Sequence, residues 1–234
     1  MLSKTKATIY LADQRGCSQE DWFRSFHIFN AGKYFNENRR PFGNLNTFND
    51  TTLKSGHTLV RYTKEETVIM LLPVVGALNV RIGNNDYTRT DVGEVFIVTV
   101  PKDSIVEIVN PYEDDLINFL EIWYTIPSSV IVPAGTVLFD LDNRKDILIP
   151  LSLNAERDLH TSSCIGKFSG RGEGIYTPTG SSHGVFVFVL EGAFEVANRL
   201  LHARDGLALY EVEAVDFEAL SNNAIIMFME VKID

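Results

Sequence analysis

A run of polar side chains at two-residue spacing is the first place in this sequence where chemistry could be done. The stretch VRYTKEETVIMLLPVVGAL, residues 60–78, carries a phenol at Tyr62, an amine at Lys64 and a carboxylate at Glu66 before an apolar segment and a glycine. Side chains two residues apart share one face of a strand, so these three are expected to face the same way. Many small β-barrels hold a metal ion against a pocket wall with such a layout, yet this stretch contains no histidine.

The composition sets broad limits on function. The chain has 234 residues, of which 45% are apolar, so it can bury a full core. Its 31 acidic and 21 basic residues give a formal charge of −10, which repels a polyphosphate backbone, so no nucleic-acid partner is expected. The amino terminus lacks the apolar region of a secretory signal, and the longest apolar run, broken by Pro73, is too short to span a bilayer. We therefore expect a cytoplasmic protein that does not bind membranes.

The two cysteines, Cys17 and Cys164, lie far apart and outside any CxxC spacing. This predicts free thiols, with neither a disulfide framework nor a thiolate metal site. Cys17 follows Arg15, and a nearby cation promotes the oxidation of a thiol, so Cys17 is the redox candidate. An inert thiol is the simpler alternative.

Short segments rich in Val, Ile and Phe, separated by turn clusters such as GNND, NPYEDD and LSNNA, predict an all-β fold. The pattern repeats, because VIMLLPVVGALNV followed by VGEVFIV has a counterpart in VFVFVLEGAFEV followed by RDGLALY. Each copy runs from a strand into Gly-Ala, an alternating strand, a charged turn with glycine and another apolar strand. That order is typical of a cupin jelly-roll barrel, and its repetition predicts two tandem cupin domains, residues 1–127 and 128–234.

The amino-terminal segment carries a dense pattern of aromatic, glycine and charged positions. Its members are Ala12, Asp13, Arg15, Gly16, Trp22, Phe26, His27, Phe29, Tyr34, Phe35, Phe42, Gly43 and Gly56. This pattern resembles the opening of the pirin family, whose members are bicupin proteins. The match is dense over the first 60 residues and looser to about Tyr124, and beyond that only the second cupin pattern supports it.

The resemblance implies a metal site in the first barrel. Metal-binding members of the family hold iron or a similar ion with a His-x-His pair, a third histidine and a glutamate, which are donors suited to a redox-capable divalent ion. If Glu66 is the closing glutamate of the motif, the His-x-His positions are Val60 and Tyr62. If the spacing is counted from Gly56, they are Tyr62 and Lys64. Neither register supplies a histidine.

The second cupin motif is traceable as PKDSIVEIVN, where the resemblance places the third histidine at Val106 and the glutamate at Ile108. Valine and isoleucine donate nothing to a metal, and a protonated lysine repels a cation. We therefore expect no bound metal and no cofactor. The remaining histidines are scattered without the spacing of a metal site: His27, His57, His160, His183 and His202.

Two hypotheses for function follow. The first is a pirin-like bicupin without a functional metal site, which binds a small molecule or a protein partner in a regulatory or stress-related role, as a monomer or weak homo-oligomer and not as an enzyme. Its pocket candidates are Tyr62, Lys64, Glu66, Val60, Val106 and Ile108. The second hypothesis is a quercetinase-type metal-dependent dioxygenase that takes its ligands from unrecognised positions. The residues at the ligand positions favour the first.

Overall fold

The computed structural model describes residues 6–128, 132–153, 162–178 and 183–233. These residues form strands and one short 3-10 helix, η1 (Ala12–Gln14), and no α-helix occurs among them, which confirms the predicted all-β class. In the same ranges there is no helix long and apolar enough to cross a membrane. The chain forms two compact units. We call Gly16–Leu138 the N-terminal barrel, and Met1–Arg15 with Phe139–Asp234 the C-terminal barrel.

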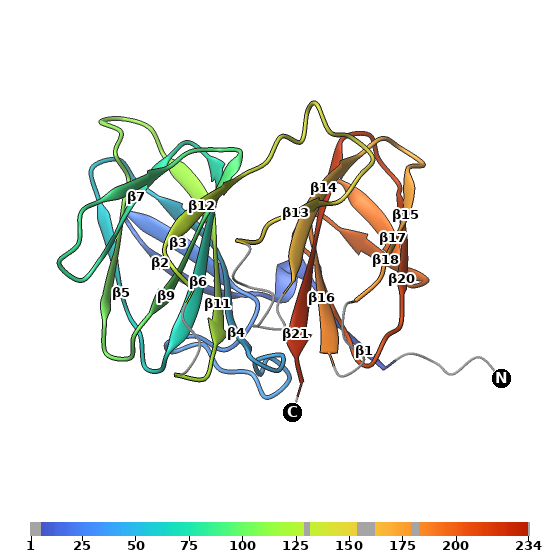
Figure 1. The fold of residues 1–234 in the computed structure, drawn as a ribbon, viewed down its shortest axis with the longest axis horizontal. Coiled ribbons are helices and arrows are strands. Elements are labelled where there is room, and N and C mark those ends of the chain that lie inside the picture. Colours follow the sequence, from blue (N-terminus) through green and yellow to red (C-terminus); the bar gives the residue numbers. More distant parts are fainter. Residues whose placement is uncertain (1–5, 129–131, 154–161, 179–182, 234) are drawn as a thin grey trace. The chain divides into compact units, whose positions relative to one another are not determined.

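The N-terminal barrel consists of two antiparallel sheets that enclose an apolar core (Figure 1). The larger sheet contains, in spatial order, β12 (Gly135–Leu138), β9 (Glu94–Val100), β6 (Thr67–Val75), β11 (Ile117–Thr125), β4 (Leu45–Leu53), β3 (Phe23–His27) and β2 (Gly16–Glu20). The smaller sheet contains β5 (Thr58–Tyr62), β10 (Ile105–Val109), β7 (Leu78–Ile82) and β8 (Thr88–Thr90). The apolar run of β6 is buried on both faces over most of its length, as expected for a central strand.

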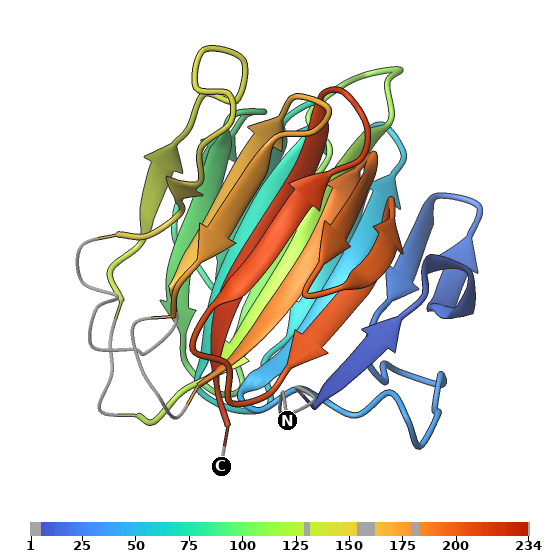
Figure 2. The same ribbon diagram turned by 90° about the vertical axis from the view of Figure 1, so that its right-hand side faces the viewer.

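The C-terminal barrel has the same construction. Its larger sheet contains β1 (Ala7–Tyr10), β19 (Gly206–Leu209), β16 (His183–Glu191), β21 (Ala224–Lys232), β14 (Ser163–Phe168) and β13 (Ile149–Pro150). Its smaller sheet contains β15 (Glu173–Tyr176), β20 (Val215–Ala219), β17 (Ala193–Val196) and β18 (Arg199–His202). Figure 2 shows β21, in red, running between its neighbours β14 and β16.

The strand order is the same in both barrels, which accounts for the internal repeat of the sequence. The order β9-β6-β11-β4 in the N-terminal barrel corresponds to β19-β16-β21-β14 in the C-terminal barrel. The order β5-β10-β7-β8 corresponds to β15-β20-β17-β18. The predicted architecture of two tandem cupin barrels is confirmed.

The limits of the two units differ from the expected 1–127 and 128–234. Backbone pairing joins β12 to the edge strand β9, so the N-terminal barrel extends to Leu138. Pairing of β1 with β19 draws the first 15 residues into the C-terminal barrel. The strand β1 thus takes in the C-terminal barrel the edge that β12 takes in the N-terminal barrel. Composition could not show these limits, because they depend on hydrogen bonds between segments far apart in the chain.

The Gly-Ala turns of the repeat require glycine for a steric reason. Gly76, between β6 and β7, has a φ of 72°, and Gly192, between β16 and β17, has a φ of 78°. In this left-handed region a side chain is strained. A Cβ at Gly76 would also lie 2.9 Å from Cγ2 of Ile117. These turns therefore leave no room for a larger residue.

We expect Gly76→Ala to destabilise the protein more than the control Gly83→Ala. Both positions have a positive φ, 72° and 57°, so both variants incur backbone strain of roughly 1–2 kcal/mol. Only Gly76 adds steric overlap, which typically costs about 1–3 kcal/mol, because nothing lies within 4 Å of a Cβ at Gly83. Urea denaturation measures the difference, and equal losses in the two variants would contradict the prediction.

Candidate functional site

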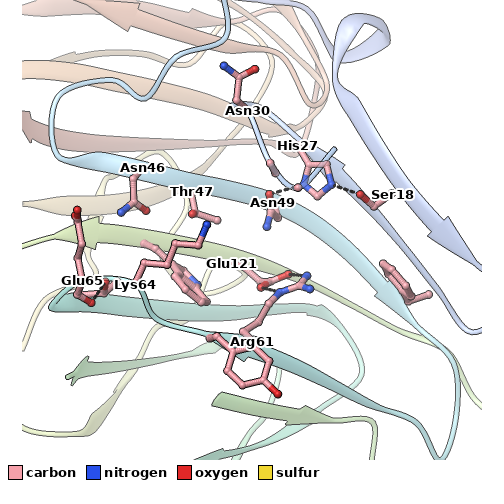
Figure 3. Close-up of a pocket in the computed structure, with 16 residues that line it drawn as sticks. Ser18, His27, Asn30, Asn46, Thr47, Asn49, Arg61, Lys64, Glu65 and Glu121 are labelled. Carbon is pink, nitrogen blue, oxygen red and sulfur yellow. Dashed lines mark hydrogen bonds and ion pairs between the residues drawn. The ribbon is translucent and has the colours of Figure 1, made fainter. Parts of the chain in front are cut away.

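A cavity of about 500 Å³ lies in the N-terminal barrel (Figure 3). Its lining comes from β2, β3, β4, β5, β6 and β11 and from the loops next to them. Small-molecule sites in proteins usually have volumes of about 300–1,000 Å³. The cavity is therefore large enough for a small organic ligand.

The base of the cavity is a polar row across three neighbouring strands of the larger sheet. The strand register places His27 on β3 opposite Asn49 on β4, and Asn49 opposite Glu121 on β11. Directly opposed residues project from the same face of a sheet, so the three side chains form one row. We call His27, Asn49 and Glu121 the cavity floor.

Glu121 is fully buried and ionised by its contacts with Arg61. Arg61 Nε donates to Oε2 of Glu121 at 2.9 Å, and Arg61 Nη2 donates to Oε1 at 2.9 Å. The Thr51 hydroxyl donates to the same Oε1 at 2.8 Å. Burial acts to raise the pKa of the Glu121 carboxyl, but the Arg61 charge and these hydrogen bonds outweigh it and hold that pKa below its usual value.

The Arg61–Glu121 ion pair joins the two sheets of the N-terminal barrel across their interior. Arg61 lies on β5 of the smaller sheet, and Glu121 lies on β11 of the larger sheet. Burial acts to lower the pKa of Arg61, but Glu121 raises it above the usual value, so both partners stay charged. Two parallel hydrogen bonds between a guanidinium and a carboxylate fix the relative orientation of both groups.

His27 is neutral and held at both ring nitrogens. Nδ1 donates to Oδ1 of Asn49 at 2.7 Å, and Nε2 lies 2.9 Å from the Ser18 hydroxyl. Because the amide oxygen can only accept, Nδ1 carries the proton and Nε2 accepts from Ser18. Burial lowers the pKa of His27 and outweighs the hydrogen bond to Asn49 and the charge of Glu121, which raise it. The imidazole is therefore uncharged at neutral pH.

Two of the six predicted pocket residues line the cavity, namely Tyr62 and Lys64. The expected common face of Tyr62, Lys64 and Glu66 does not form, because β5 ends at Tyr62. The next residue, Thr63, is buried, and its hydroxyl donates to the Pro101 carbonyl at 2.6 Å. Two-residue alternation therefore stops before Lys64.

The other four predicted residues lie outside the cavity lining. On β5 the inward positions are Leu59 and Arg61, so Val60 points outward and is 40% exposed. Val106 and Ile108 on β10 are fully buried in the apolar core. Glu66 is half-buried, and its backbone carbonyl accepts a hydrogen bond from Ile126.

The side chains at the positions of the implied metal site do not fit a metal ion. Val106 and Ile108 place only carbon atoms in the core, and the Tyr62 side chain is 65% exposed. Both oxygens of Glu121 already accept hydrogen bonds from Arg61. Among the described residues, no group of three or more His, Cys, Asp or Glu side chains could hold a metal ion. His160 lies outside the described residues.

One feature of the sequence points to the buried ion pair, which the motif spacing does not predict. Glu121 interrupts the apolar run INFLEIWY, and a carboxylate buried in such a strand needs a charged or hydrogen-bonding partner. The partner, Arg61, is 60 residues away and lies between two positions that were proposed as ligands. Only the strand phase shows that Arg61, and not Val60 or Tyr62, reaches the buried Glu121.

The two cysteines are free thiols, as predicted. Cys164 in the C-terminal barrel is buried, and burial raises its pKa to about 12, which keeps it protonated. Cys17 is exposed on β2. Its proposed redox role stays a prediction.

Similarity to known proteins agrees with this architecture. Residues 164–231 match the model of the quercetinase C-terminal cupin domain. A quercetin 2,3-dioxygenase of Escherichia coli K12 is 20% identical over 225 residues, which cover 94% of this chain and 97% of that protein. A putative quercetin 2,3-dioxygenase of Pasteurella multocida is 20% identical over 224 residues, which cover 93% of this chain and 96% of that protein.

Two solved structures share the fold over nearly the whole chain. The crystal structure of YhhW from Escherichia coli superposes with a TM-score of 0.85 at 16% identity, covering 98% of this chain and 99% of that one. The structure of bacterial pirin YhhW in complex with nickel(II) gives a TM-score of 0.84 at 16% identity, with 98% and 100% covered. Such identities establish a common fold and leave the site chemistry to be argued from this chain.

We expect Arg61→Met to destabilise the protein by about 3–5 kcal/mol, because it leaves the Glu121 carboxylate buried without its counter-ion. The double variant Arg61→Met/Glu121→Met removes both charges and should regain most of this loss. Arg89→Met is the control, since its pair with Asp91 is exposed and such pairs contribute at most about 1 kcal/mol. Urea denaturation of all three variants checks the prediction, and a double variant no more stable than Arg61→Met would refute it.

The stability of the protein should fall with pH below the ordinary histidine value of 6.5, because the pKa of His27 is lowered in the folded state. Below that pH the unfolded chain takes up a proton that folded His27 resists, so stability is complete above it and declines as the pH falls. The stability that Glu121 contributes is lost only at a lower pH, because the ordinary pKa of a glutamate is 4.5 and the pKa of Glu121 in the folded state is lower still. Thermal unfolding between about pH 7.5 and 5.5 should show a larger loss for the native chain than for His27→Gln. Parallel curves would show that His27 is not the source.

Proposed function

This chain is a cupin protein of the pirin family, and we propose that it binds a small molecule in an N-terminal barrel that has no functional metal site. The observation that carries the proposal is the Arg61–Glu121 ion pair at the cavity floor. The role we propose is non-catalytic, regulatory or stress-related, and located in the cytoplasm. The alternative to a small-molecule ligand is a protein partner.

The ion pair opposes metal binding in two ways. The guanidinium of Arg61 lines the cavity with a positive charge, and a charge of that sign repels a divalent cation. The carboxylate of Glu121 is the only carboxylate of the cavity floor, and its oxygens are held by Arg61 and Thr51. A metal ion would have to displace Arg61 from a buried partner before it gained a carboxylate ligand from the floor.

The same groups suit the recognition of an organic ligand. The cavity combines fixed polar atoms on its floor with the aromatic side chains of Phe23 and Trp123. Small-molecule sites typically combine apolar walls with a few placed polar groups. His27 and Glu121 have their polar atoms engaged within the protein, which favours a binding role over acid-base chemistry.

A metal-dependent quercetin dioxygenase is the second candidate function. It is favoured by the match of residues 164–231 to the quercetinase C-terminal cupin model and by the names of the relatives that the chain matches nearly end to end. It requires ligands from other positions. The two hypotheses differ in a quantity that is simple to measure, the metal content.

We expect the purified chain to contain far less than one equivalent of iron, nickel, copper, manganese or zinc, and to leave quercetin unchanged. Elemental analysis after dialysis against a chelator measures the metal, and the absorbance of quercetin under oxygen follows the reaction. The Escherichia coli quercetin 2,3-dioxygenase, prepared in parallel, serves as positive control. About one equivalent of metal that survives dialysis and is lost in Glu121→Gln would overturn the proposal and revive the enzyme.

A further inference from the structure

The cavity of the N-terminal barrel contains two cationic groups whose hydrogen-bond donors are not all used within the protein. On the floor, the hydrogen-bonding capacity of Glu121 and His27 is used within the protein. Arg61 uses Nε and Nη2 for Glu121, while its Nη1 has no partner among the described residues. In the same part of the chain, the Lys64 ammonium also has no hydrogen-bond or ion-pair partner. Two cationic donors are thus available to a ligand.

A third donor lies in the cavity lining. Trp123 is 7% exposed, and its indole Nε1 is a buried atom without a hydrogen-bond partner in the described structure. Asn46 also lines the cavity, and its buried Oδ1 likewise has no hydrogen-bond partner among the described residues. Buried polar atoms in native proteins are nearly always paired, so these two atoms mark a part of the cavity lining whose hydrogen bonding is incomplete.

The geometry of the two cations favours an anion. Arg61 approaches from the smaller sheet and has its charge at the cavity floor. Figure 3 shows Lys64 reaching across the cavity with its amino group toward Thr47, whereas Glu65 turns away from the middle. The negative charge of Glu121 offsets that of Arg61, so the surplus charge available to a ligand is that of Lys64. A single negative charge matches it better than two.

We propose that the ligand of this cavity is a small aromatic monocarboxylate, whose carboxylate binds Arg61 Nη1 and Lys64 Nζ and whose ring packs against Trp123 and Phe23. A carboxylate offers two oxygens to two cationic donors, and hydrogen bonds of this charge-assisted kind are the strongest available. A flat ring suits the aromatic part of the lining, and the volume of about 500 Å³ accommodates it. The inference rests on the proposed small-molecule function and adds the class of ligand.

The test uses the full chain and two matched sets of probes. Benzoate, 4-hydroxybenzoate and cinnamate are titrated by calorimetry beside the corresponding neutral amides, which keep the shape and lose the charge. We expect at least one acid to bind about tenfold or more tightly than its amide, as expected for a charge-assisted pair.

Variants locate the carboxylate. Lys64→Gln should weaken binding of the acid about tenfold and leave the amide unchanged. Lys54→Gln is the matched control, because it removes the same exposed charge from the same barrel outside the cavity lining. Arg61→Gln/Glu121→Gln removes the second cation without leaving a buried charge unpaired and should also weaken the acid.

The outcomes separate the inference from the function on which it rests. If neither acids nor amides bind, both the proposed function and the carboxylate inference fail. Amides that bind as tightly as the acids would retain the pocket function and overturn the choice of a carboxylate. Acid binding that is unchanged in Lys64→Gln and in the double variant would overturn the assigned position.

Discussion

The fold and the site of the N-terminal barrel both depend on how one buried carboxylate is neutralised. Glu121 is fully buried in the middle of an apolar strand, where a charge is stable only with a close partner. Arg61 supplies that partner from the opposite sheet, with two hydrogen bonds of 2.9 Å. The pair therefore sets the phase of β5 as well as the charge of the cavity, because Arg61 must point toward Glu121 and Val60 must point outward.

The polar row around this pair is the basis of our proposal that this cupin barrel keeps a cavity without a functional metal site. In the nickel(II)-bound bacterial pirin that shares this fold, a cation is present in the protein as a bound ion. In this chain the cation at the cavity floor is a side chain, and it is covalently fixed. In our proposal, a fixed guanidinium beside a free ammonium favours a ligand that brings its own negative charge over one that completes a metal shell.

Comparison of particular segments shows why the fold was predictable and the site was not. The Gly-Ala turns at Gly76 and Gly192 recur because each needs a positive φ, and such local requirements are legible in the sequence. The family resemblance places Val60, Tyr62, Val106 and Ile108 at the pocket, and strand alternation places Lys64 and Glu66 on the face of Tyr62. The alternation does not extend to Lys64 and Glu66, because β5 ends at Tyr62. A shift of one residue in strand phase exchanges the inner and outer faces of a strand. For this reason the motif register selects Val60 and Tyr62, the two neighbours of Arg61, and not Arg61 itself.

The sequence by itself determined the all-β class, the repeated barrel, the likeness to the pirin family and the absence of histidine at the expected ligand positions, since each depends on residue types and short spacings. Only the tertiary structure decided which barrel holds β1, that Arg61 pairs with Glu121, and that His27 completes the floor beside Asn49. Those facts depend on contacts between residues 22 to 202 positions apart in the chain. Hydrogen bonds across sheets and between distant strands are selected by the packing of the whole domain, which no local pattern specifies.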